Sequence, residues 1–175
     1  MLEFDNKINL GTLIPLALFV AGYFVKWWLA AAAKHRQRRR FYAAIYTEVQ
    51  LNTMKLERDA SSVPPIQVGN ALLAKKATYR PHVLSFISSD IYKSNLAMLP
   101  ELPEILVKSL ISFYGNLETI LVITKSFENK SFETISVASR QFILALFVNH
   151  LKETAKEGSD LIKKLKDALK ISDVT

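Results

Sequence analysis

The sequence has no cysteine and only five glycines among its 175 residues. The absence of cysteine excludes disulfides, iron–sulfur clusters, thiolate zinc sites and thiol nucleophiles. The glycines form neither a Walker A motif nor a G-x-G-x-x-G motif, and no G-x-S-x-G motif is present, so the usual sequences for phosphate binding and serine hydrolysis are missing. The sequence therefore predicts no catalytic residue and no cofactor.

Metal-ligand spacing is also missing. The three histidines, His35, His82 and His150, do not form an H-E-x-x-H motif or another known ligand pattern. Glu153 follows His150 by three residues, which reverses the Glu-x-x-His order of di-metal helical bundles, and no second copy occurs. The sequence predicts no metal site.

One long uncharged run stands out near the N-terminus, from Ile8 to Val25. A helix rises about 1.5 Å per residue, so this run is just long enough to cross a hydrocarbon layer of roughly 30 Å. The apolar character continues to Ala33, and Lys26, Trp27 and Trp28 are residue types that suit a membrane–water interface. We predict a transmembrane helix over 8–33.

Basic residues follow this helix. The tract after it contains Lys34, Arg36, Arg38, Arg39 and Arg40, whereas only Lys7 precedes it. Because positive charge accumulates on the cytosolic side of membrane helices, residues 1–7 are expected outside and the rest of the chain in the cytosol. A cleaved signal peptide ending near 31–33 is the alternative, but its apolar region would be too long and its start is not basic. The tract can also meet anionic lipids, a reading we favour over nucleic-acid binding.

The remaining periodicity predicts an all-α chain, with the transmembrane helix continuing into a cytosolic bundle of about four to six helices. A basic juxtamembrane helix is expected over 34–60, because apolar positions recur by threes and fours, and a helical domain over 61–175. Short helices are expected at 66–79 and 83–98, the latter with an alternative start at Ile91 capped by 88–90. A longer helix is expected after Pro103, on a stripe of Leu106, Leu110, Phe113, Leu117 and Leu121.

Two features of the last third carry further expectations. The sequence QFILALFV at 141–148 is apolar nearly all round, which predicts a centrally buried helix, but it is too short to span a bilayer. Gly158 is expected to break or bend the chain before a basic, amphipathic last helix. That helix either lies on the inner leaflet or, as we favour, packs on the domain with its lysines in water.

Glu48 and Asn52 are one turn apart beside an apolar stripe, so they are either a buried polar pair or the edge of a solvated face, and the pattern favours the solvated edge. The chain combines an N-terminal anchor and a basic flank with three motifs: Ile45-x-x-Glu48-x-x-x-Asn52, Tyr92-x-Ser94-Asn95-Leu96 before a proline, and Phe113-Tyr114-x-x-Leu117. In this combination it resembles uncharacterised small bacterial single-pass membrane proteins with a cytosolic helical domain. The resemblance implies a bacterial inner membrane and a structural network of Glu48, Asn52, Tyr92 and Asn95. It carries over no functional residue.

These observations favour a non-enzymatic interaction protein: an accessory or scaffold subunit that meets a protein partner, or further copies of itself, at the membrane. The alternatives are a membrane-tethered enzyme with an unrecognised helical site, and an effector that binds membrane surfaces or nucleic acid through basic helices. A deep polar pocket with strongly perturbed acids would favour the enzyme.

Overall fold

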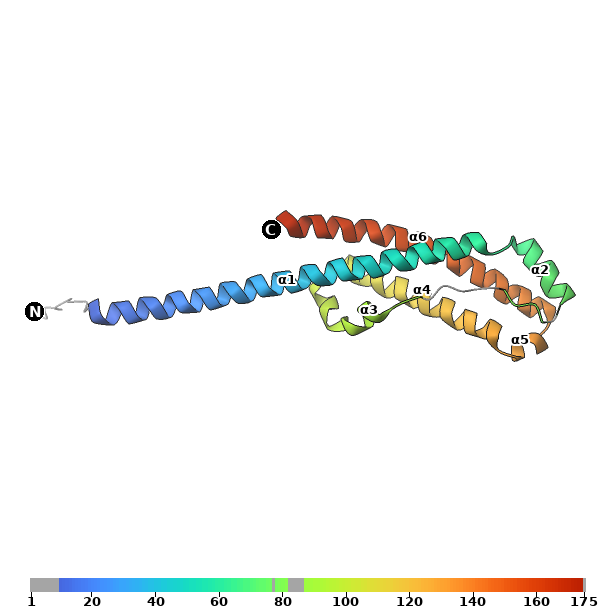
Figure 1. Ribbon diagram of the computed structural model, residues 1–175, viewed down its shortest axis with the longest axis horizontal. Coiled ribbons are helices and arrows are strands. Elements are labelled where there is room, and N and C mark those ends of the chain that lie inside the picture. Colours follow the sequence, from blue (N-terminus) through green and yellow to red (C-terminus); the bar gives the residue numbers. More distant parts are fainter. Residues whose placement is uncertain (1–9, 77, 82–86, 175) are drawn as a thin grey trace, which may run out of the picture. The chain divides into compact units, whose positions relative to one another are not determined.

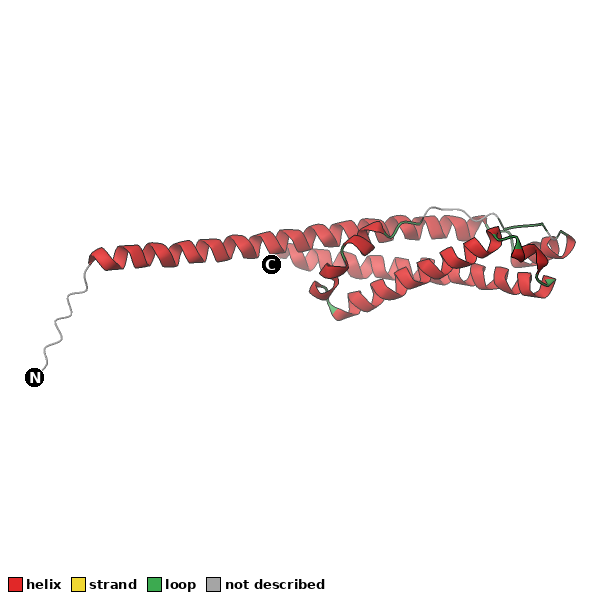
Figure 2. Cartoon of the chain, turned by 90° about the horizontal axis from the view of Figure 1, so that it is seen from below, coloured by secondary structure: helices red, strands yellow, loops and turns green. Residues whose placement is uncertain are grey.

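The computed structural model describes residues 10–76, 78–81 and 87–174, with side chains from 15 to 169 within those ranges. The described chain is 88% helix and contains no strand, which confirms the predicted all-α class (Figures 1 and 2). Its elements are α1 (Leu10–Ser62), α2 (Ile66–Lys75), α3 (Asp90–Ser94), the 3₁₀ helix η1 (Leu96–Glu101), α4 (Glu104–Glu128), α5 (Ser131–Thr134) and α6 (Val137–Val174).

The chain divides into two compact units, Met1–Arg40 and Phe41–Thr175. Helix α1 contributes residues to both. In the first unit, its side chains from Pro15 onward are nearly all exposed, and the helix is long and apolar enough to cross a membrane. Helix α4 is also long and apolar enough, but a third of its most apolar stretch is buried, as in the core helix of a folded domain.

The core of the second unit is formed by α1 beyond Phe41 together with α4 and α6. The predicted stripe of α1 is buried: Phe41, Ile45, Val49, Asn52 and Leu56. Helices α4 and α6 run side by side in both views, and α2 packs against α6. The compact unit thus begins at Phe41, whereas the sequence pattern suggested a domain starting at 61, because residues 41–60 supply core side chains as well as a helix after the basic tract.

The predicted stripe of α4 is confirmed over Leu106, Leu110, Phe113 and Leu117. It then shifts by one residue, so that Ile120 is buried and Leu121 half-buried. Pro103 stands at the N-cap of α4, one position before the helix, where its missing N–H costs little.

Gly158 does not break the chain, which corrects the expectation from sequence, because α6 continues through it from Val137 to Val174. A Cβ atom at this position would lie 2.8 Å from the ring of Phe113 and closer still to the Thr53 hydroxyl. The missing side chain therefore lets α6 approach α1 and α4 closely, and this close approach explains the glycine. Beyond it, Leu161 and Leu165 are buried and Lys163, Lys164 and Lys166 exposed, as in the favoured model of a packed last helix.

The prediction that QFILALFV forms a centrally buried helix is wrong, because one face of it is exposed. Leu144 and Phe147 are buried, but the side chain of Phe142 is 68% exposed and that of Leu146 is also exposed. Helix α6 meets α2 and α4 with one face, so the residues on the opposite face remain in contact with solvent in the described part of the unit.

The segment between α2 and α4 is only partly described. Helix α2 ends at Lys75, a turn earlier than predicted, and the predicted helical residues 83–86 lie outside the described residues. The alternative of a new helix at this point is the one observed, although α3 begins at Asp90, one residue before the expected start at Ile91.

Candidate functional site

The most elaborate polar cluster in the described residues surrounds Glu48 on α1, whose side chain is only 3% exposed. One carboxylate oxygen accepts hydrogen bonds from the Ser88 hydroxyl at 3.1 Å and the Ile91 N–H at 2.9 Å. The other accepts from the Tyr92 N–H at 3.0 Å and the Tyr114 hydroxyl at 2.6 Å. Each oxygen faces two donors, and three of the four donate to Glu48 alone, which satisfies the buried negative charge. The fourth, the Ser88 hydroxyl, has one hydrogen and also lies 3.1 Å from the Asp90 carboxylate.

Glu48 also caps α3 from a different helix. Ser89 occupies the N-cap position of α3, but among the described contacts its side chain makes no capping hydrogen bond. The N–H groups of Ile91 and Tyr92, in the first turn of α3, donate to Glu48 instead. A carboxylate at this end also complements the partial positive charge of the helix N-terminus. The cluster thus fastens α3 to α1.

Asn52, one turn further along α1, holds Ser88, which lies two residues before the start of α3. Its side-chain amide donates to the Ser88 carbonyl at 2.6 Å, and its oxygen accepts from the Ser88 N–H at 3.1 Å. Asn52 is only 1% exposed. The preference for a solvated edge at Glu48 and Asn52 is therefore wrong, because both side chains are buried under the segment around Ser88.

Two tyrosines complete the cluster. The ring of Tyr92 stacks on that of Tyr114, with centroids 4.0 Å apart and an angle of 9° between planes. Burial, followed by the hydrogen bond to Glu48 and its negative charge, raises the pKa of Tyr114 well above its ordinary value of 10.0. Burial and the charge of Glu118 raise the pKa of Tyr92 in the same direction. Both phenols stay protonated at neutral pH, which suits hydrogen-bond donation rather than base catalysis.

The structure gathers three of the four residues of the predicted network around Ser88 and α3: Glu48 accepts from the Tyr92 N–H, and Glu48 and Asn52 each bond to Ser88. The fourth, Asn95, donates to the Ile91 carbonyl at 2.8 Å, at the other end of α3. Ser88 and Tyr114 were missed as members. Ser88 lies in the predicted cap sequence 88–90 and Tyr114 in the Phe113-Tyr114 motif, but neither pattern says which helix the side chain meets.

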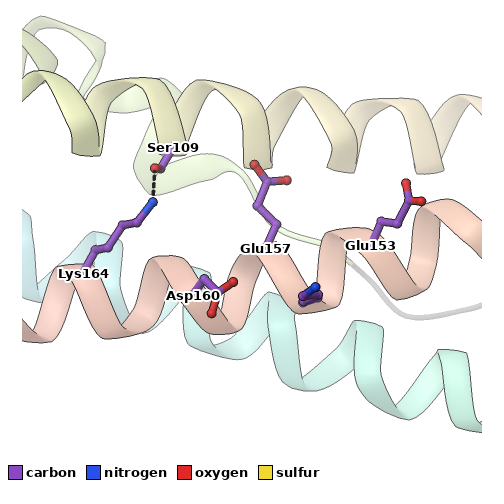
Figure 3. A pocket seen from close by; sticks show the side chains of 6 residues that line it. Ser109, Glu153, Glu157, Asp160 and Lys164 are labelled. Atoms are coloured by element: carbon purple, nitrogen blue, oxygen red, sulfur yellow. Dashed lines mark hydrogen bonds between the residues drawn. The ribbon is translucent and has the colours of Figure 1, made fainter.

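A second polar region is an open pocket of about 310 Å³ between α4 and α6 (Figure 3). Its lining residues are Ser109, Glu153, Lys156, Glu157, Asp160 and Lys164. Lys164 donates to the Ser109 hydroxyl at 2.9 Å. Two of the acids already have partners, since Glu157 accepts from Asn116 at 2.8 Å and Asp160 pairs with Lys163 at 3.2 Å. In the described residues, no group of three or more histidine or acidic side chains is placed to hold a metal ion.

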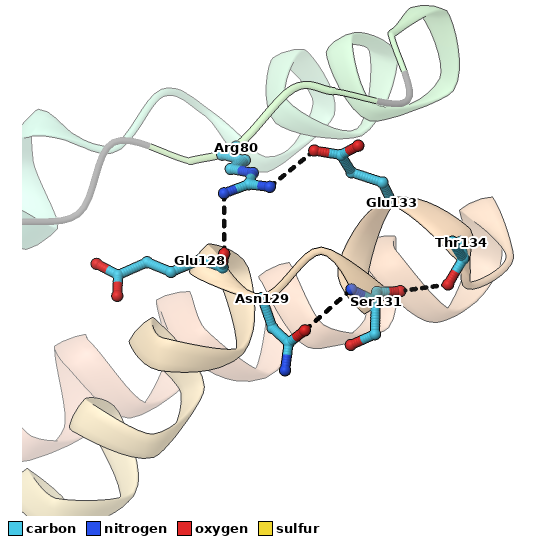
Figure 4. Close-up of polar contacts among 6 residues, drawn as sticks. All are labelled: Arg80, Glu128, Asn129, Ser131, Glu133 and Thr134. Carbon is cyan, nitrogen blue, oxygen red and sulfur yellow. Dashed lines mark hydrogen bonds and ion pairs between the residues drawn. The ribbon is translucent and has the colours of Figure 1, made fainter.

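Arg80 joins the segment after α2 to the corner between α4 and α5 (Figure 4). Its guanidinium donates to the Glu128 carbonyl at 3.0 Å and to the Glu133 carboxylate at 2.7 Å. A cation beside the last carbonyl of α4 complements the negative end of that helix. Arg80 thus links the segment after α2 to the end of α4 and to α5, and this role is in holding the fold together.

The residues predicted to lie at a membrane interface all belong to the first unit. Trp27 and Trp28 are exposed, and so are Lys26, Lys34, Arg36, Arg39 and Arg40, while Arg38 is half-buried. Arg36 donates to the carbonyl of Ala32, one turn before it, at 3.3 Å. The structure thus leaves the aromatic and basic positions at the surface of the helix.

Comparison with known proteins gives no further guide to function: no family model matches the chain, and no curated protein or solved structure is significantly similar to it.

Proposed function

We propose that this protein is a non-enzymatic interaction protein, anchored in a bacterial inner membrane by a single helix, with its N-terminus outside and its helical domain in the cytosol. It acts as an accessory or scaffold subunit of a membrane-associated complex. The observation that carries the proposal is the apolar part of α1, which is exposed in the structure and is followed by basic residues.

Ten large apolar or aromatic side chains between Leu16 and Leu29 are each at least 45% exposed: Leu16, Leu18, Phe19, Val20, Tyr23, Phe24, Val25, Trp27, Trp28 and Leu29. Burial of one such side chain is worth about 1.5–3 kcal/mol, so leaving all of them in water is strongly unfavourable. A bilayer removes this cost, and the tryptophans and basic residues at the C-terminal side of the run suit an interface with the cytosol.

The proposed role in binding a partner is supported by a contrast in the second unit: polar side chains are paired within the unit, whereas some apolar side chains are exposed. Glu48, Asn52 and Tyr114 hold helices together, and the acids Glu157 and Asp160 have partners on neighbouring residues. By contrast, α6 leaves the apolar side chains of Phe142 and Leu146 in solvent. A partner that covers these side chains would remove an exposed apolar surface.

Quantitative copurification tests the proposal. The full chain, purified from its native membranes in a mild detergent after brief cross-linking, is expected to bring down a defined subunit or further copies of itself in a fixed ratio. Phe142→Asp should weaken that association, whereas Ser112→Asp, which adds the same charge at an exposed polar position of α4, should leave it unchanged. A protein that is isolated alone and is monomeric under these conditions would contradict the proposed role.

A further inference from the structure

The region after the apolar helix has an unusual charge distribution. No acidic residue occurs between Asp5 and Glu48, and this stretch includes Lys34, Arg36, Arg38, Arg39 and Arg40, which we call the cationic collar. Four of its five members are arginines. Arginine matches pairs of phosphate oxygens with two parallel hydrogen bonds, which lysine cannot do.

The helical geometry spreads the collar around the whole circumference of α1. The collar lies inside α1, where successive residues turn by about 100° around the axis. Relative to Lys34, the four arginines therefore point at about 200°, 40°, 140° and 240° in chain order, and no gap between neighbouring cations exceeds about 120°. The collar extends over about 9 Å along the axis, slightly more than the polar layer of about 5–8 Å on one side of a bilayer.

This distribution favours one kind of partner. A nucleic acid that lies along a helix contacts one side of it, and a one-sided stripe of cations would suit it best. Cations on all sides suit a helix that passes through a layer of headgroups, where anions surround it. The adjacent Trp27 and Trp28 are exposed, as expected at such a layer.

We infer that the cationic collar binds the phosphate groups of anionic phospholipids and enriches these lipids around the anchor. This inference rests on the proposed membrane anchoring. It adds a lipid selectivity that anchoring alone does not require, because an apolar helix inserts into zwitterionic bilayers as well.

The two tryptophans allow a direct test, because they are the only ones in the chain and lie seven residues or fewer from the collar. The full-length protein is placed in nanodiscs of phosphatidylcholine and phosphatidylglycerol, with the same pyrene-labelled acyl chain carried in a small fraction of either lipid. Energy transfer from tryptophan to pyrene should be about twofold higher when the anionic lipid carries the label, and the preference should shrink at high salt.

The collar variant R36Q/R38Q/R39Q/R40Q should lose the preference. The matched control K75Q/K76Q/K125Q/K130Q removes four exposed charges from the second unit and should keep it. Equal transfer to both lipids in the wild type, or a preference that survives in the collar variant, would overturn the inference alone.

The same experiment gives a different result if the proposed membrane anchoring is wrong. A chain that does not enter nanodiscs, and shows no transfer to either lipid, would overturn both the proposed anchoring and the lipid inference. Retention of duplex RNA or DNA by inserted protein at physiological salt, without a lipid preference, would assign the collar to nucleic acid instead.

Discussion

Glu48 accepts four hydrogen bonds in the described part of the chain, and its contribution to stability depends on both carboxylate oxygens being acceptors. In Glu48→Gln, one oxygen becomes an NH₂ group, which cannot accept from the two donors that it faces. Hydrogen bonds to charged groups contribute about 1.5–3 kcal/mol, and donors left unpaired in a buried site add to the loss. We expect the free energy of unfolding to fall by about 2–4 kcal/mol.

Urea unfolding of the detergent-solubilised full chain, followed by circular dichroism, measures this loss. The control is Glu104→Gln, which removes the charge of an exposed glutamate paired with Lys108 and should change stability by no more than about 0.5 kcal/mol. Equal effects of the two substitutions would show that the network around Glu48 does not stabilise the fold.

Tyr114 makes stability depend on alkaline pH. Its pKa is raised in the folded state, so the protonated phenol is favoured by folding. Below pH 10 the tyrosine is protonated in both states and its full contribution is present. As the pH rises above the unfolded value of 10.0, the unfolded chain loses this proton first, and stability falls by up to about 1.4 kcal/mol per pH unit.

Comparing wild type with Tyr114→Phe isolates this contribution from that of the lysines, which titrate in the same range. The variant keeps the aromatic ring over Tyr92 but lacks the proton, so its stability should decline less steeply between pH 10 and 11.5, as measured by urea unfolding. Parallel declines in the two proteins would refute a raised pKa for Tyr114.

At the scale of elements, alanine substitutions at two helical glycines are expected to change stability in opposite directions. A methyl group at Gly158 would meet Thr53 and Phe113, whereas at Gly115 on α4 it would meet nothing within 4 Å. Gly158→Ala should therefore destabilise the protein by about 1–3 kcal/mol through overpacking, despite the better helix propensity of alanine. Gly115→Ala should stabilise it by about 0.5–1 kcal/mol.

Thermal or urea unfolding of the two variants gives the sign directly. Thr53→Ala combined with Gly158→Ala should recover part of the loss, because it removes the nearer of the two contacts. A stabilising Gly158→Ala would mean that α6 does not approach α1 and α4 as closely as the structure shows.

These glycines also show how far the sequence could predict the elements. Periodic apolar residues gave the stripes of α1 and α4 and the end of α1 within two residues, because a helix that packs on one side must repeat its buried residues every three or four positions. The helix break expected at Gly158 and the central burial expected for QFILALFV were wrong. Both depend on how many neighbours surround α6, which is a property of the assembled bundle.

The contacts of the polar cluster around Glu48 could likewise be predicted only in part from the sequence. The spacing of Glu48 and Asn52 placed them on one face, but it could not show that the chain around Ser88, about 40 residues later, would cover that face. Tyr114 lies on a third helix, so its hydrogen bond to Glu48 follows from tertiary packing and is not visible in local sequence.

At the scale of the whole molecule, the proposed orientation follows from the unequal charge on the two sides of the apolar run. It predicts that residue 6 lies outside the cell membrane and residue 112, an exposed serine of α4, inside. Because the chain has no cysteine, Asn6→Cys and Ser112→Cys each introduce a unique thiol. A membrane-impermeant maleimide applied to intact spheroplasts should label only the first, and after permeabilisation it should label both.

The same experiment separates the anchor from a cleaved signal peptide. Cleavage near 31–33 would remove residue 6 and shorten the chain, and mass spectrometry of the mature protein would detect this loss. Export would also make the thiol at position 112 accessible in intact spheroplasts. An anchor oriented by its basic flank requires the opposite result at both positions, since translocating the arginines of the cationic collar across the membrane is unfavourable. Labelling of position 112 before permeabilisation would therefore refute the cytosolic placement of the second unit.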